Sequence, residues 1–296
     1  MAKKRKATKR STSARKPKRS ARSAMSVATN ARKTVKERVA ALAEVPLAVC
    51  ESDENLQAIL NVLRNKDEAV NVRLAALQSL QTASFSVVAF ESCRGDYIGT
   101  LREVTEDPDP EIRQRVLGIL AREKDGYAQK KLLEGLQHPE KALVPAEKAL
   151  QLLSYDVHAE TYQIARSIVS KPPNAAAKRE ALRLLAADAS AAPVFEKILR
   201  DKDELAEIRQ ISASVLQALK PEKLRAHARE MLLDRSDYDD IKVTSLTALT
   251  QFGDQAAITN DEALIKCVDR LRGAGSAKIK QSARRFLDKY RAKGGR

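Results

Sequence analysis

Residues 106–120 read EDPDPEIRQRVLGIL, an acidic, proline-containing stretch that is followed at once by an apolar pattern. Proline lacks an amide hydrogen and fixes φ, so Pro108 and Pro110 are expected to end one helix and begin the next. The carboxylates of Asp107 and Asp109 suit the free amide groups and the positive dipole at a helix N-terminus. The stretch therefore predicts a turn between two amphipathic helices.

This junction recurs along the chain. From Arg113 as an anchor, apolar residues follow at three, four and seven positions, which places them on one face of a helix. Four further anchors fit this frame, Arg73, Lys178, Arg209 and Lys242, and Pro145 and Lys280 begin weaker copies. A second apolar segment, such as LQAILNVL at 56–63, precedes each anchor, and the anchors are 31 to 40 residues apart. A period of this length with two helices per unit is typical of a helical solenoid.

The repeated unit, with its acidic Asp-Pro-Asp turn and an Ile-Arg or Val-Arg start to the second helix, resembles the HEAT repeat over roughly residues 54–290. The resemblance implies hairpins whose first (A) helices line a convex side and whose second (B) helices line a concave side. It also implies a ladder between neighbours, made by the aspartate of the turn and the arginine that starts helix B. The residues that match this ladder are Asp67, Arg73, Asp107, Asp109, Arg113, Asp201, Asp203 and Arg209. Anchors 145, 178 and 242 depart from it, because proline carries no charge and lysine lacks the guanidinium fork.

The fold class that follows is all-α, a right-handed superhelical α-solenoid of about seven HEAT-like helical hairpins. We expect a disordered basic tail at 1–30, the solenoid at 31–290 and a basic C-terminal tail at 291–296. An N-terminal capping helix is expected at about 31–43.

The period is interrupted at 83–97 and 253–262. Insertions in solenoids often gather on a binding face. The first insertion carries Phe85, Val87, Val88 and Phe90, and its simpler interpretation is a longer buried helix or loop that fills a gap between hairpins.

The net charge of +15 is unevenly distributed. Residues 1–36 contain 14 Lys or Arg and no acidic residue, and residues 270–296 contain ten with Asp288 as the one acid. The remaining 233 residues hold 30 bases and 38 acids, a net of −8. The N-terminal segment resembles linker-histone-like tails in composition, and it has too few large apolar residues to fold.

Such a tail suits phosphate neutralisation that is independent of base sequence, and KKRK at 3–6 resembles a nuclear-import signal. A second, helical contact is expected near the C-terminus. The residues expected to contact nucleic acid are Lys3, Lys4, Arg5, Lys6, Lys9, Arg10, Arg15, Lys16, Lys18, Arg19, Arg22, Lys278, Lys280, Arg284 and Arg285.

The expected concave face consists mostly of small, neutral and polar residues. This composition favours a peptide or protein surface over a duplex, which would require Lys and Arg there. The residues assigned to this face are Gln78, Gln114, Arg179, Arg183, Gln210, Ser214 and Thr247.

Several function classes are disfavoured. No run of about 18 apolar residues predicts a membrane span. Three distant cysteines form no disulfide framework and fit a reducing compartment. The three histidines are scattered and the acidic turns lack EF-hand spacing, so neither a metal nor a cofactor is expected.

HEAT-like DNA glycosylases hold DNA in a basic concavity lined by Trp or Tyr, and this chain has no Trp. The basic tail does not fit the HEAT-like bilin lyases.

The sequence thus predicts a non-enzymatic, cytoplasmic scaffold that is monomeric alone. It would bind a protein partner on the concave face and DNA, RNA or another polyanion through the N-terminal tail. The alternatives are a nucleic-acid-binding protein in its own right, nucleoid-associated in a bacterium or nuclear in a eukaryote, a HEAT-like DNA glycosylase, and a protein that binds anionic membrane surfaces.

Overall fold

The computed structural model describes residues 21–291, and all regular structure in that range is helical, with seventeen α-helices and two 3-10 helices. The predicted all-α class of repeated helical hairpins is confirmed. Among the described helices, none combines the length and the hydropathy that crossing a membrane requires. The chain divides into two compact units, one ending at Ala128 and the other beginning at Gln129.

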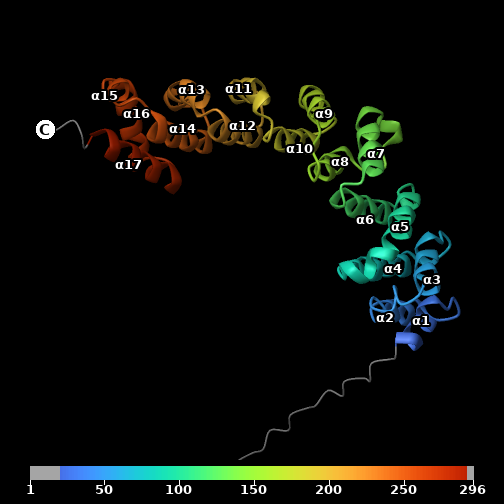
Figure 1. Cartoon of the computed structure of the whole chain (residues 1–296). Helices are drawn as coiled ribbons and strands as arrows, with labels where there is room; N and C mark the ends of the chain where they lie inside the picture. The colour runs from blue at the N-terminus through green and yellow to red at the C-terminus, as the bar shows by residue number, and fades with distance from the viewer. Residues whose placement is uncertain (1–20, 292–296) are drawn as a thin grey trace, which may run out of the picture. The chain divides into compact units, whose positions relative to one another are not determined.

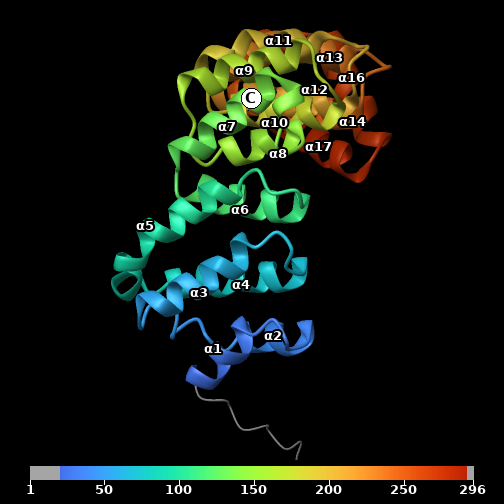
Figure 2. The same ribbon diagram turned by 90° about the vertical axis from the view of Figure 1, so that its right-hand side faces the viewer.

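The first unit contains three hairpins (Figure 2). Its helices are α1 (Ala21–Thr29), α2 (Val35–Leu42), α3 (Asp53–Arg64), α4 (Val70–Ser84), α5 (Val87–Val104) and α6 (Pro110–Arg122). Within each hairpin the A helix packs on the B helix. Across hairpins α1 packs on α3 and α3 on α5, while α2 packs on α4 and α4 on α6. The A helices therefore form one layer and the B helices another.

The second unit repeats this arrangement. Its elements are α7 (Gly126–Gln137, which begins in the first unit), η1 (Pro139–Lys141), α8 (Ala146–Leu153), α9 (Ala159–Ser170), α10 (Ala175–Leu185), η2 (Ala189–Ala191), α11 (Ala192–Arg200), α12 (Ala206–Leu219), α13 (Pro221–Leu233), α14 (Asp239–Phe252), α15 (Gln255–Thr259), α16 (Glu262–Gly273) and α17 (Ala277–Arg291). Helices α8, α10, α12, α14 and α17 pack in sequence as the B layer. Figure 1 shows α11 and α13 in one row and α10, α12 and α14 in the other.

The N-terminal boundary differs from the prediction. Residues assigned to a disordered tail form α1, whose Ala24, Met25 and Ala28 are buried. The helix expected to cap the solenoid at about 31–43 covers Val35–Leu42 and is the B helix of an additional hairpin. Helix α1 folds with few large aliphatic residues, because its small side chains let it approach α2 closely.

The interruptions of the period are helical. Residues 87–91 lengthen the N-terminal end of α5, and part of 253–262 forms α15, whose Ile258 is buried. The glycine at 253 permits a close approach, because a Cβ there would lie 2.6 Å from the Tyr290 hydroxyl. At the C-terminus α17 includes Arg291, the first residue of the predicted basic tail, and residues 292–296 lie outside the described residues.

Candidate functional site

Three arginines near the start of a B helix occupy one repeated buried position. They are Arg38 on α2, Arg73 on α4 and Arg209 on α12. The Nε atom of each donates to the backbone carbonyl ten residues earlier, in the last turn of the preceding A helix, at 3.0, 2.9 and 2.9 Å respectively. Each arginine thereby satisfies a carbonyl that the helix end would otherwise leave unpaired, and it closes its own hairpin.

The remaining guanidinium nitrogens reach a carboxylate in the turn of the following hairpin. Arg73 Nη1 lies 3.1 Å from Asp107 Oδ1 and its Nη2 bonds Oδ2, and both side chains are buried. Arg209 holds Asp237 in the same way at 2.8 and 2.9 Å. Arg38 pairs with Glu68 at 2.6 Å. The bidentate contacts of Arg73 and Arg209, and the single contact of Arg38, fix the register of neighbouring hairpins.

These rungs join neighbouring hairpins, and neither arginine pairs with an aspartate of its own turn. Arg73 does not pair with Asp67, and Arg209 pairs with neither Asp201 nor Asp203, because the guanidinium points along the stack rather than back into its own turn. Asp67 and the pair Asp201 and Asp203 are exposed at their turns.

The other matched positions play different parts. Asp109 caps α6 by accepting from the amides of Glu111 and Ile112. Arg113 donates to the backbone carbonyls of Asp107 and Pro108.

Lysine replaces arginine in two units and behaves differently in each. The Lys178 ammonium pairs with Glu204 of the next turn, so this rung is present although the sequence left it in doubt. The buried Lys242 instead donates to the carbonyls of Arg235 and Asp237, at 3.1 and 2.7 Å, inside its own hairpin. A single ammonium cannot reach both a helix end and the next turn, as the guanidinium does.

The expected concave face corresponds to the exposed side of the B helices. Its two arginines are already engaged: Arg179 lies 3.0 Å from Glu207 of the next B helix, and Arg183 pairs with Glu180. Gln210 bonds Thr244, while Ser214 is exposed and Thr247 donates to a carbonyl of its own helix. Gln78 and Gln114 are exposed on α4 and α6 of the first unit. The B-helix face of the described residues therefore carries little free positive charge.

The terminal helix α17 has two contrasting faces. Ile279, Phe286 and Tyr290 are buried, and α17 packs against α14 and α16. On the other face Lys278, Arg284 and Arg285 are exposed, and Lys280 is half-buried. The side chains of these four cations have no ion-pair or hydrogen-bond partner among residues 21–291. Of the expected N-terminal contacts, Arg22 is exposed on α1, and the ten from Lys3 to Arg19 lie outside the described residues.

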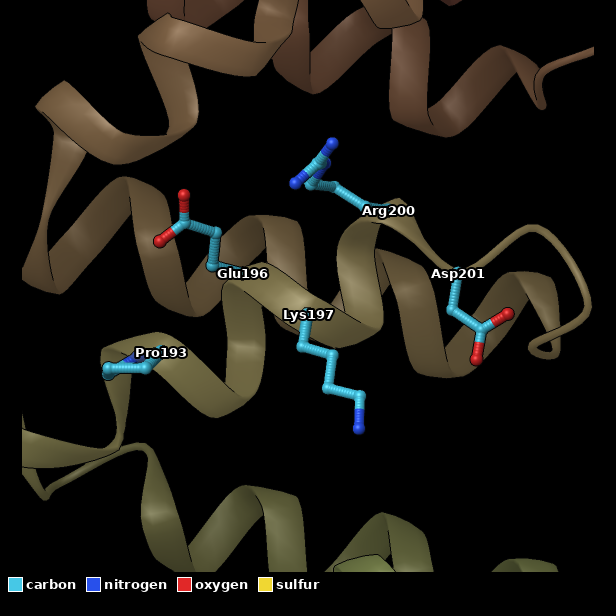
Figure 3. Close-up of a pocket in the computed structure, with 5 residues that line it drawn as sticks. All are labelled: Pro193, Glu196, Lys197, Arg200 and Asp201. Atoms are coloured by element: carbon cyan, nitrogen blue, oxygen red, sulfur yellow. The ribbon is translucent and has the colours of Figure 1, made fainter.

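A shallow hollow lies on the surface of α11 (Figure 3). It is lined by Pro193, Glu196, Lys197, Arg200 and Asp201. The charged side chains point in different directions and do not converge on one point. A 2.6 Å hydrogen bond with His227 lowers the pKa of the Glu196 carboxyl, so this carboxylate is committed to a partner on α13. The residues that line the hollow do not place a nucleophile, a base and an orienting group together, as a catalytic site requires.

Other reactive side chains are also dispersed. Within the described part of the chain, no three His, Cys, Asp or Glu side chains gather as metal ligands. Cys50, Cys93 and Cys267 are free thiols.

Comparison with protein-family models gives no match, and comparison with curated proteins gives none. Among solved structures, the chain is similar to the complex of CpcE and CpcF of phycocyanin lyase from Nostoc sp. PCC7120. The identity is 14%, the match covers 89% of this chain and 98% of that chain, and the TM-score is 0.41. A similarity of this degree identifies neither a substrate nor a partner for this chain.

The comparison nevertheless corrects one prediction. The conclusion that the chain is not an enzyme is wrong as an inference from architecture and composition, because the similar structure belongs to a lyase complex.

Proposed function

We propose that the protein is a helical-repeat adaptor that binds a protein partner on its B-helix face and is held to nucleic acid, or to another polyanion, by its basic ends. The N-terminal residues 1–20 supply ten Lys or Arg and no acid. Helix α17 supplies a second, ordered contact. The free thiols fit a reducing compartment. The proposed location is therefore the cytoplasm, with polyanion contact in the nucleoid of a bacterium or the nucleus of a eukaryote.

The observation that carries the polyanion contact is the unpaired basic face of α17. Many cations of the helical body already have a carboxylate partner, as Arg64 has Glu103 and Arg229 has Asp261. On α17, Lys278, Arg284 and Arg285 have none among the described residues. Cations without a protein partner release bound counterions from a phosphate chain at no cost to the fold.

The protein partner is supported by the chemistry of the B-helix face. Arg179 and Arg183 are neutralised by Glu207 and Glu180, so the face offers amide and hydroxyl groups rather than charge. Such a surface recognises polar peptide groups and does not attract a duplex.

Two variants test the polyanion contact. We expect deletion of residues 1–20 to remove most salt-sensitive retention on immobilised duplex DNA and RNA, with an unchanged far-ultraviolet circular dichroism spectrum. Adding K278E, R284E and R285E should remove what remains. Retention that survives both changes would overturn the proposal, and retention lost only with the α17 changes would assign nucleic-acid binding to the body itself.

A pull-down with and without nuclease tests the protein partner. A partner that stays bound after nuclease treatment, and is lost when the exposed Ser214 is changed to Arg, supports the B-helix face. A partner released by nuclease, or retained by S214R, contradicts it.

A further inference from the structure

The N-terminal end of α5 carries an unusual group of exposed apolar side chains, which we call the apolar tip: Phe85, Val87 and Val88. They are 77%, 70% and 94% exposed. Single exposed apolar residues are ordinary on a soluble protein, but three within four positions form a patch. The tip lies where the repeat period is broken, and in Figure 2 this end of α5 lies at the left-hand edge of the first unit.

The opposite side of the same helix is fixed. Phe90, Cys93 and Tyr97 are buried, and the rings of Phe90 and Tyr97 make an edge contact with centroids 5.3 Å apart and planes at 85°. The extension of α5 is therefore held in place by its inner face. The valines at 87 and 88 cannot turn inward without displacing this aromatic pair.

A loop of the preceding hairpin adds a fourth apolar side chain to this edge. In residues 43–52, Val45 and Val49 are buried while Leu47 is 83% exposed. Helices α3 and α5 pack in a register of 39 residues, since Gln57 Nε2 bonds Asp96 Oδ2 at 2.6 Å and Arg64 bonds Glu103 at 2.7 Å.

Residues 43–52 are not helical, so this register ends at the start of α3, and the loop is placed by its own contact with α5. A contact between this loop and α5 is direct: burial and then a side-chain hydrogen bond to Cys93 raise the pKa of the Cys50 thiol to about 12. Leu47 stands three residues before Cys50 and is exposed on this loop, which contacts the N-terminal half of α5.

The surroundings of this edge are acidic. Residues 39–63 contain four acidic residues and no Lys or Arg. Glu44, Glu51 and Glu91 are exposed, and none of their carboxylates has a cationic partner among residues 21–291. We call these three residues the acidic rim. Elsewhere in the first unit exposed carboxylates do find partners, as Glu103 and Glu123 do.

We propose that the apolar tip and Leu47, with the acidic rim around them, dock a basic amphipathic helix of a partner protein. An apolar stripe on that helix would cover Phe85, Val87 and Val88, and lysine or arginine beside the stripe would face the rim. A second copy of this edge would bring like charges together, and an anionic membrane surface would be repelled. The chain's own residues 2–20 are basic but contain no large apolar side chain.

This surface is separate from the B-helix face and from the basic ends. Binding at the apolar tip can therefore be tested independently of the adaptor function proposed above. The probe is a labelled peptide of about 18 residues with leucine at helical spacing and lysine elsewhere, compared with the same peptide carrying glutamate in place of lysine. Fluorescence anisotropy with the full chain gives the dissociation constants.

We expect the lysine peptide to bind and the glutamate peptide not to bind. F85S/V87S/V88S should weaken binding at least tenfold, while L205S, which changes a 56% exposed leucine of the second unit, should leave binding unchanged. E44Q/E51Q/E91Q should weaken binding several-fold and remove most of its salt dependence.

Since all six side chains are exposed, these variants should retain the wild-type circular dichroism spectrum. Equal binding of both peptides, or unchanged binding by the triple serine variant, would overturn the proposal. Self-association, or retention on anionic vesicles, that the triple serine variant abolishes would assign the edge to a different occupant and overturn the proposal equally.

Discussion

The guanidinium of Arg73 joins three segments of chain, since it bonds the last turn of α3, lies on α4 and holds the turn before α6. The sequence frame locates this arginine correctly at the start of a B helix. Its partner could not be read from the sequence, because Asp67 and Asp107 both lie in turns of the right composition. Which carboxylate it meets depends on how far neighbouring hairpins are offset, and that offset is a property of packing between helices.

Removal of this carboxylate should be costly. Asp107→Asn leaves the buried Arg73 charge without its counter-ion, so we expect the free energy of unfolding to fall by about 3–5 kcal/mol at pH 7. The matched control is Glu111→Gln, which breaks an exposed pair with Arg115 on α6 and should cost about 0.5 kcal/mol or less. Urea unfolding followed by circular dichroism measures both. Equal effects of the two variants would mean that Arg73 and Asp107 do not form a buried pair.

The same pair predicts a dependence on pH. Burial alone would raise the pKa of Asp107, but hydrogen bonds from Arg73 and from the Asp109 amide outweigh it and lower the pKa below the ordinary 3.8. Because the folded-state pKa is the lower one, the stabilisation is complete above pH 3.8 and is lost as the pH falls through the folded value. The stability difference between wild type and Asp107→Asn should therefore shrink below pH 3.8. A difference that is constant from pH 7 to pH 2 would contradict the lowered pKa.

At the scale of the element, the sequence located most helices because apolar spacing and turn chemistry agree. The failure at α1 has a definite cause. Its buried residues are Ala24, Met25 and Ala28, and the half-buried Val27 is its single branched aliphatic residue, so the helix lacks the apolar stripe by which the other helices were recognised. One signal could have revealed it: Arg38 stands 35 residues before Arg73, in phase with the repeat.

Truncation distinguishes a tail from a hairpin. Deletion of residues 1–20 should leave the stability of the first unit unchanged. Deletion of residues 1–30 removes the buried Met25 and the Ala28 carbonyl that Arg38 binds, and should cost about 3 kcal/mol. Hydrogen exchange of the amides of α2 and α4 measures the effect. Equal protection of these amides in both truncated proteins would show that α1 does not stabilise the first unit and behaves as part of the tail.

At the scale of the whole molecule, composition predicted where charge gathers but not which charges are free. The count of 30 bases in residues 37–269 gives no hint that Arg179 and Arg209 are neutralised by residues 28 positions further along the chain. On α17 no following hairpin exists among the described residues to supply such partners. Position at the end of a stack therefore decides whether a basic residue is available for binding.

This distinction can be tested through salt dependence. For duplex DNA the slope of log K against log salt is negative, and its magnitude decreases by roughly 0.9 for each phosphate contact that is lost. K278Q/R284Q/R285Q should therefore lower this magnitude by about 2–3, because these cations contact phosphate directly. The control variant K36Q/K130Q/R235Q changes the net charge equally at exposed positions on other elements, and its slope should stay at the wild-type value. Equal loss of slope in both variants would show that binding follows net charge alone and that the basic face of α17 is no specific contact.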